Sequence, residues 1–222
     1  MKLAPFVEDL GPYWTGDTPS APLTLEFLGD DASVVELPEG PIGAFLVDPD
    51  GVARPGFGVT SPADEPDADD QWAGLTWPAA FTLDLPGVWQ LVAVVGGRRL
   101  PSAPFVVQTD DGWHTLDSAR SEWIEARQAS DVQLFTLLDS ARVQCLAYAP
   151  RLSVTLDGAE VPLPVPTHYR TAQLMQARAL WQSMRANADP SAEGEFAVPT
   201  FPMDWTVRGI LRPRNPKARR SS

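Results

Sequence analysis

The first half of the chain repeats short apolar or alternating apolar–polar runs, each closed by proline, glycine or aspartate. Alternation with a period of two residues is typical of a strand that buries one face. The pattern predicts five strands, at residues 23–27, 43–47, 80–85, 88–95 and 100–107. Gly96 and Gly97 separate the last two runs and can supply the positive φ angles of a tight hairpin. Strands at this spacing predict an all-β, immunoglobulin-like sandwich over residues 20–109, with Trp89 as a candidate core residue.

Two segments of the first half lack this strand pattern. Residues 1–19 are rich in proline and glycine, and we expect them to form an arm or an irregular edge. Residues 61–70 contain five acidic residues and two prolines, which favours an exposed loop.

After residue 112 the apolar residues recur every three or four positions, the period of an amphipathic helix. Thr115 is expected to cap a first helix, whose apolar stripe is Leu116, Ala119, Trp123 and Ala126. Ser130, with Gln133 three positions later, has the signature of a capping box for a second helix. The stripe of this second helix is Leu134, Leu138, Ala141, Cys145 and Tyr148, and Pro150 ends it.

A hairpin and two more helices are expected in the rest of the second half. Residues 154–161 alternate around Asp157-Gly158, which is typical of a tight turn. A third helix, capped by Thr167 and running to about Asn187, is expected to face inward with Ala172, Met175, Ala179 and Leu180. Residues 203–211 predict a short last helix, stopped by a proline.

The predicted fold is therefore α+β with two domains. The sandwich is followed by a small α-helical domain with one hairpin at residues 113–211 and by a basic tail at residues 212–222.

Charge divides the chain in the same way. Residues 1–112 carry 18 acidic and 4 basic residues, whereas residues 113–222 carry 11 acidic and 13 basic residues. Six bases and no acid fall within residues 208–220. The first half should repel polyanions, while the basic end could meet an acidic protein surface or a phosphate backbone.

The residues of common catalytic and metal sites are scarce. His114 and His168 have no Cys, Asp or His at metal-ligand spacing. Cys145 lies within a helical pattern and is expected to be a small buried apolar residue. No phosphate-binding glycine loop or nucleophile elbow occurs, and acidic pairs such as Asp30-Asp31 adjoin turn-forming residues. We therefore expect a protein that is not an enzyme and that uses no cofactor and no metal.

Three stretches of the second half carry a resemblance to a known family. The first comprises residues 115–123 leading into residues 137–150, the second residues 169–181, and the third residues 202–213. In sequence and in order they resemble the head-to-tail connector, or adaptor, family of bacteriophages with long non-contractile tails. The resemblance does not extend to residues 1–108, which we expect to be an added decoration domain.

The resemblance implies a structural protein of the virion neck, made in the host cytoplasm. Such adaptors form a ring, usually of twelve copies, below the portal protein, and a stopper or tail-side protein joins them from the other side. Double-stranded DNA would pass through the lumen without sequence recognition. No apolar run approaches the ~18 residues that a membrane span needs, so no membrane is expected.

A ring requires contacts between subunits, and two sets of residues on the helices are candidates. Trp123, Trp181 and Trp205 could lie between subunits or belong to each subunit's own core. Arg170, Arg178 and Arg185 are spaced seven and eight positions apart, so they share one helix face. They could form a row of salt bridges between subunits or a solvated face.

The basic end of the chain offers a third set. Its bases could pair with carboxylates between portal subunits, contact DNA phosphates, or form a disordered solubilising end. The candidate portal-binding residues are Arg208, Arg212, Arg214, Lys217, Arg219 and Arg220.

Two other kinds of protein remain as alternatives. One is a carbohydrate- or cell-surface-binding protein that acts through the sandwich, for which Trp72 and Trp77 would have to form an exposed aromatic platform. The other is a DNA-binding regulator, which is disfavoured because the bases cluster near the end of the chain and not on a recognition helix.

Overall fold

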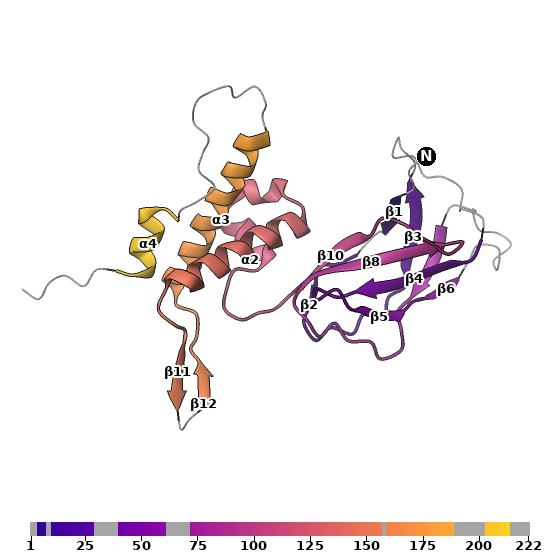
Figure 1. The fold of residues 1–222 in the computed structure, drawn as a ribbon, viewed down its shortest axis with the longest axis horizontal. Coiled ribbons are helices and arrows are strands. Elements are labelled where there is room, and N and C mark those ends of the chain that lie inside the picture. Colours follow the sequence, from indigo (N-terminus) through magenta and orange to yellow (C-terminus); the bar gives the residue numbers. More distant parts are fainter. Residues whose placement is uncertain are drawn as a thin grey trace, which may run out of the picture. The chain divides into compact units, whose positions relative to one another are not determined.

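The computed structural model describes residues 4–7, 10–28, 40–60, 72–156, 159–188 and 203–213. The chain divides into two compact units, Met1–Thr109 and Asp110–Ser222 (Figure 1). The first unit is built from strands, and the second consists mainly of helices with one small hairpin. The α+β prediction is therefore confirmed.

Two sheets of the first unit share one apolar core. The smaller sheet has the order β1 (Ala4–Val7), β3 (Leu23–Leu28), β7 (Trp72–Thr76) and β6 (Gly58–Thr60). The larger has the order β2 (Tyr13–Trp14), β10 (Ala103–Gln108), β8 (Gly87–Val95), β4 (Ile42–Val47) and β5 (Ala53–Gly56), with β9 (Arg98–Arg99) also paired to β8. Neighbouring strands are antiparallel except β2 and β10, which are parallel. Trp89 lies fully buried in the core, as expected.

The chain crosses from the larger sheet to the smaller one at Phe57. Its N–H donates to the carbonyl oxygen of Ala44, and its ring lies buried against Trp77. A Cβ atom at Gly56 would lie 2.9 Å from the same carbonyl oxygen, so only glycine fits this approach. The backbone contact therefore depends on a residue without a side chain.

The strand expected at residues 80–85 is absent, although its alternating burial is present. Phe81 and Leu83 point into the core, but the segment forms no ladder. The N–H of Leu83 instead donates to Asp17, and its carbonyl accepts from Gly16. The alternation was correctly read as one buried face, but the prediction of a strand was wrong because these backbone groups bond to an irregular segment.

The parts of residues 1–19 that the structure describes are not a separate arm. Residues 4–7 pair with β3 and residues 13–14 pair with β10, so both are edge strands of the sheets. Gly96 and Gly97 form the expected turn, with φ angles of 56° and 79°. The turn joins β8 to β9, and the chain then continues into β10. The acidic segment expected as a loop, residues 61–70, lies outside the described residues.

The second unit contains α1 (Leu116–Glu122), the 3-10 helix η2 (Ile124–Gln128), α2 (Asp131–Tyr148), α3 (Thr167–Ala188) and α4 (Trp205–Leu211). Thr115 and Ser118 form a reciprocal capping box on α1, and the hydroxyl of Ser130 caps α2 by accepting from the N–H of Gln133. The expected first helix is split because Trp123 has extended backbone angles between α1 and η2. All four apolar residues of its predicted stripe are nevertheless buried.

The inward face of α3 matches the expected one at Ala172, which is buried, and at Met175, which packs against the core, but differs from it elsewhere. Thr167 is the first helical residue and not a cap, and Ala179 is exposed. The buried residues of the helix include two glutamines; they are Tyr169, Ala172, Gln173, Leu174, Gln176, Ala177 and Ser183. The prediction placed only apolar residues on the inward face, whereas the helix also buries two amide side chains. Ala179 was therefore wrongly predicted to face inward.

One apolar cluster of the second unit lies where α2, α3 and α4 meet. It contains Trp113, Cys145, Ala149, Tyr169, Ala172, Met203, Val207 and Leu211. The hairpin of β11 (Ser153–Leu156) and β12 (Ala159–Pro162) connects α2 to α3 and projects away from the helices (Figure 1). It matches the hairpin expected around residues 154–161.

Candidate functional site

A groove of about 630 Å³ lies between the end of α1, η2 and α3. Two aromatic rings form part of its wall, because Trp123 and Trp181 meet edge to face with their centroids 6.4 Å apart. Ile124, the first residue of η2, is 64% exposed at its edge. The full lining is Ser121, Glu122, Trp123, Ile124, Glu125, Arg178, Trp181, Gln182 and Arg185.

Two arginines of α3 cover these rings. Arg178 donates from Nη2 to the carbonyl oxygen of Glu122 at 2.7 Å, and its guanidinium lies 5.9 Å from the ring centroid of Trp123. Arg185 lies 6.0 Å from the ring centroid of Trp181. Guanidinium groups at this distance are attracted to the negative face of an aromatic ring. The groove therefore combines apolar surface with two arginines, and two glutamates, Glu122 and Glu125, also line it.

Two hydrogen-bond donors at this groove have no acceptor. Within the described part of the chain, Nε of Arg178 and Nε1 of Trp181 are buried and make no hydrogen bond. A buried donor without a partner costs roughly 1–3 kcal/mol. Both nitrogens lie inside the subunit and not on the open surface of the groove.

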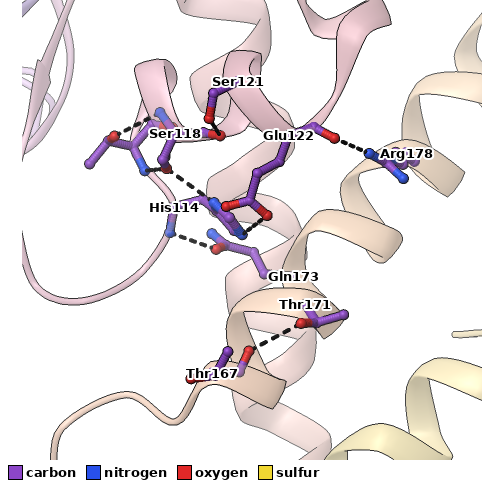
Figure 2. Close-up of polar contacts among 9 residues, drawn as sticks. His114, Ser118, Ser121, Glu122, Thr167, Thr171, Gln173 and Arg178 are labelled. Atoms are coloured by element: carbon purple, nitrogen blue, oxygen red, sulfur yellow. Dashed lines mark hydrogen bonds and ion pairs between the residues drawn. The ribbon is translucent and has the colours of Figure 1, made fainter.

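A buried polar cluster lies next to the groove, between α1 and α3 (Figure 2). The backbone N–H of His114 donates to Oε1 of Gln173 at 3.0 Å, and Nε2 of Gln173 donates to the carbonyl oxygen of Leu138 at 3.0 Å. Nδ1 of His114 lies 3.0 Å from the hydroxyl of Ser118. Gln173 therefore joins the segment before α1 to the middle of α2.

His114 also faces a carboxylate. Its Nε2 lies 4.0 Å from Oε2 of Glu122, and the imidazole is almost entirely buried. Burial lowers the pKa of His114 below 6.5; the charges of Arg170 and Arg178 lower it further, and Glu122 acts in the opposite direction. No role is predicted for this histidine from the sequence, and Gln173 and Gln176, two polar residues on the face of α3 that turns inward, were the one available signal.

The three tryptophans expected at subunit contacts differ in exposure. Trp123 is 3% exposed and belongs to the subunit's own interior, because the extended residue between α1 and η2 turns its ring toward α3. Trp181 is half-buried at the groove, and Trp205 is 82% exposed on the first turn of α4. The choice of Trp123 as an interface residue is therefore corrected.

The three arginines expected to form one row on α3 have different surroundings. Arg178 and Arg185 line the groove, whereas half-buried Arg170 acts electrostatically on His114. No contact with another subunit is needed to explain the position of Arg178, since it binds the backbone of its own α1.

Arg208 and Arg212 belong to the helical unit itself. Their guanidinium groups lie 5.8 and 4.8 Å from the ring centroid of Tyr148 on α2. Arg212 is also the C-cap residue of α4. These contacts stabilise α4 against α2, so the basic tail can begin only beyond Pro213. The remaining tail candidates, Arg214, Lys217, Arg219 and Arg220, lie outside the described residues.

The aromatic platform expected for glycan binding is not available. Trp77 is buried in the core of the first unit, where its ring contacts Tyr13, Phe57 and Phe81. The side chain of Trp72 lies outside the described residues. A pair of exposed tryptophans therefore cannot form, because half of it is part of the core.

Exposed large apolar side chains concentrate on the second unit. Of the eleven found among the described residues, only Trp14 and Val52 belong to the first unit. The nine on the second unit are Ile124, Val143, Leu146, Val154, Leu156, Val161, Leu163, Met184 and Trp205. Such an accumulation on one module is typical of surfaces that contact other proteins.

Other kinds of site find little support in the described part of the chain. Its His, Cys, Asp and Glu side chains form no group of three that could hold a metal ion. Cys145 is buried, and burial raises the pKa of its thiol to about 12, which keeps it in the unreactive protonated form. Among the described helices, none has both the length and the apolar character needed to cross a membrane.

Comparison with known proteins identifies no family. No family model matches the chain, and no curated protein matches it. Among solved structures, the crystal structure of the Lin-41 filamin domain is similar over 47% of this chain and 91% of its own, with 14% sequence identity and a TM-score of 0.28. A likeness at this TM-score carries no argument about the fold or function of the chain.

Proposed function

We propose that the chain is a structural protein that assembles with copies of itself into a ring, as a head-to-tail adaptor in the neck of a tailed bacteriophage. The ring lies below the portal protein, is joined by a stopper or tail-side protein, and lets double-stranded DNA pass through its lumen. The proposal places the protein in the virion and assigns it no enzymatic activity.

One observation carries this proposal: nine of the eleven exposed large apolar side chains lie on the helical unit. A small helical unit of this kind buries more of its apolar surface when it packs against neighbours. The same unit contains the three stretches that resemble the adaptor family. An oligomerising structural protein explains both facts with one surface.

The two ends of the chain have different roles in this proposal. The first unit is an immunoglobulin-like sandwich that decorates the neck, supported by its two sheets around one core and by the crossing between them at Phe57. Its acidic surface would keep it away from the DNA lumen. The bases beyond residue 213 pair with carboxylates of the portal, while Arg208 and Arg212 hold α4 in place.

Electron microscopy of the chain mixed with the portal protein of its own phage tests the proposal. The expected result is an additional ring on one end of the portal. A portal that remains bare at every concentration would overturn the proposed function. A chain truncated after Pro213 tests the tail: we expect weaker docking with an unchanged helical circular dichroism signal, and unchanged docking would reject that role.

A further inference from the structure

The first unit holds the chain as far as Gln108, the last residue of β10. Gln108 is buried and pairs with Trp14 of β2. Its carbonyl oxygen accepts hydrogen bonds from the N–H of Thr15 at 2.8 Å and from the hydroxyl of Thr15 at 3.2 Å. The chain is therefore fixed to the first unit up to this residue.

The second unit holds the chain again from Asp111. Oδ2 of Asp111 lies 2.6 Å from Nη1 of Arg142 on α2, and Oδ1 accepts the N–H of Trp113 at 3.3 Å. The guanidinium of Arg142 also lies 5.5 Å from the ring centroid of Trp113, which is buried. These three residues, which we call the clamp, attach the segment before α1 to the middle of the helical unit.

Gly112 is fixed within the same segment by its backbone and by its packing. Its φ angle is 87°, a conformation that glycine adopts without steric cost. A Cβ atom at this position would lie 3.3 Å from Cβ of Val165, which itself packs against the apolar cluster around Trp113. A freely moving linker needs neither a special backbone angle nor a close neighbour, so Gly112 belongs to the second unit.

Only Thr109 and Asp110 lie between the two attachments. Neither residue is part of a helix or a strand, and Asp110 is exposed. Two residues span at most about 7 Å when fully extended. The sequence of residues 109–112, Thr-Asp-Asp-Gly, has the composition of a flexible loop, but its second half is held by the helical unit.

We propose that the clamp confines movement between the two units to a hinge of two residues, Thr109 and Asp110. Release of Asp111 frees Gly112 as well, because the next buried residue is Trp113. The hinge then has four residues and a reach of about 14 Å, twice that of the clamped chain. The inference applies to the single chain and does not depend on the proposed ring.

Distances between spin labels on the two units measure this freedom. Val52→Cys and Ile124→Cys provide the labelling positions, because both side chains are exposed, whereas the native Cys145 is buried. Double electron–electron resonance of the full-length chain, diluted with unlabelled chain, gives the width of the distance distribution. We expect this distribution to be roughly 1.5-fold wider in Asp111→Ala and in Arg142→Ala, because either substitution lengthens the hinge.

Arg120→Ala is the matched control. It removes another ion pair of the same unit, the one with Asp131, whose side chains are about as exposed as those of the clamp. The width should stay at the wild-type value in this variant. Equal widths in the wild type, Asp111→Ala and Arg142→Ala would overturn the proposal, and so would equal widening in Arg120→Ala.

An insertion tests the length of the hinge without any change to the clamp. Four residues of alternating glycine and serine placed after Thr109 lie outside both attachments, so both units should keep their circular dichroism signals. The distance distribution should widen at least as much as in Asp111→Ala. A distribution as narrow as that of the wild type would show that the two units are held by something other than the short hinge, and would reject the inference.

Discussion

Replacement of Gln173 by leucine should destabilise the helical unit without changing its shape. The side chain of Gln173 is almost completely buried, and it accepts the backbone N–H of His114 and donates to the carbonyl oxygen of Leu138. Leucine has a similar volume and helix propensity, so neither a cavity nor a poorer helix is expected. The substitution removes only the two hydrogen bonds of the amide group.

The magnitude follows from which groups lose their partners. The carbonyl of Leu138 keeps its bond within α2, whereas the N–H of His114 loses its acceptor in a buried site. A buried unpaired donor costs about 1–3 kcal/mol, so we expect the free energy of unfolding to fall by about 2 kcal/mol. With a urea m value of about 1.5 kcal/mol/M, the unfolding midpoint should fall by about 1 M.

Urea unfolding followed by helical circular dichroism measures this effect in the second unit of the intact chain. The control is Gln133→Leu, the same exchange at an exposed position of α2, which should change the free energy of unfolding by less than about 0.5 kcal/mol. Equal midpoints for the two variants would refute the reasoning that Gln173 is held inward by its hydrogen bonds.

Three further outcomes are expected. Because burial lowers the pKa of His114, the unfolded chain takes up a proton more readily, so the free energy of unfolding should decrease as the pH falls below 6.5; a pH series of urea midpoints should lose that decrease in His114→Gln. Gly56→Ala should lower the melting temperature of the first unit, because its Cβ would meet a backbone oxygen at 2.9 Å, whereas Gly58→Ala on the same crossing makes an ordinary contact and should be milder; calorimetry that ranks them oppositely would contradict this. Leu211→Ala should cost about 2–4 kcal/mol in urea unfolding because it opens the core, while Trp205→Ala should leave stability unchanged and weaken the association of subunits measured by analytical ultracentrifugation, and a stability loss in the latter would place its ring in the core.

The tertiary structure decided which of several similar side chains face the interior. Trp123 and Trp205 both stand in helical surroundings in the sequence, yet one is buried and the other is 82% exposed. Burial depends on where α1, η2 and α4 dock, and no local pattern contains that information. In the same way, the sequence groups Arg208 and Arg212 with a basic tail, whereas in the structure both guanidinium groups lie against the ring of Tyr148.

Features that depend on near neighbours in the chain were determined by the sequence itself. The caps at Thr115 and Ser130, the turn at Gly96 and Gly97, and the hairpin after α2 follow from local hydrogen bonding and backbone freedom, which a few adjacent residues fix. Features that depend on distant partners were not. The segment at residues 80–85 alternates like a strand but pairs with an irregular neighbour, and Gln173 is buried because its amide finds partners in two other segments. The position of a buried polar residue, or the structure of a segment with alternating polarity, can be predicted correctly only when its hydrogen-bond partners are known. These partners come from other parts of the fold.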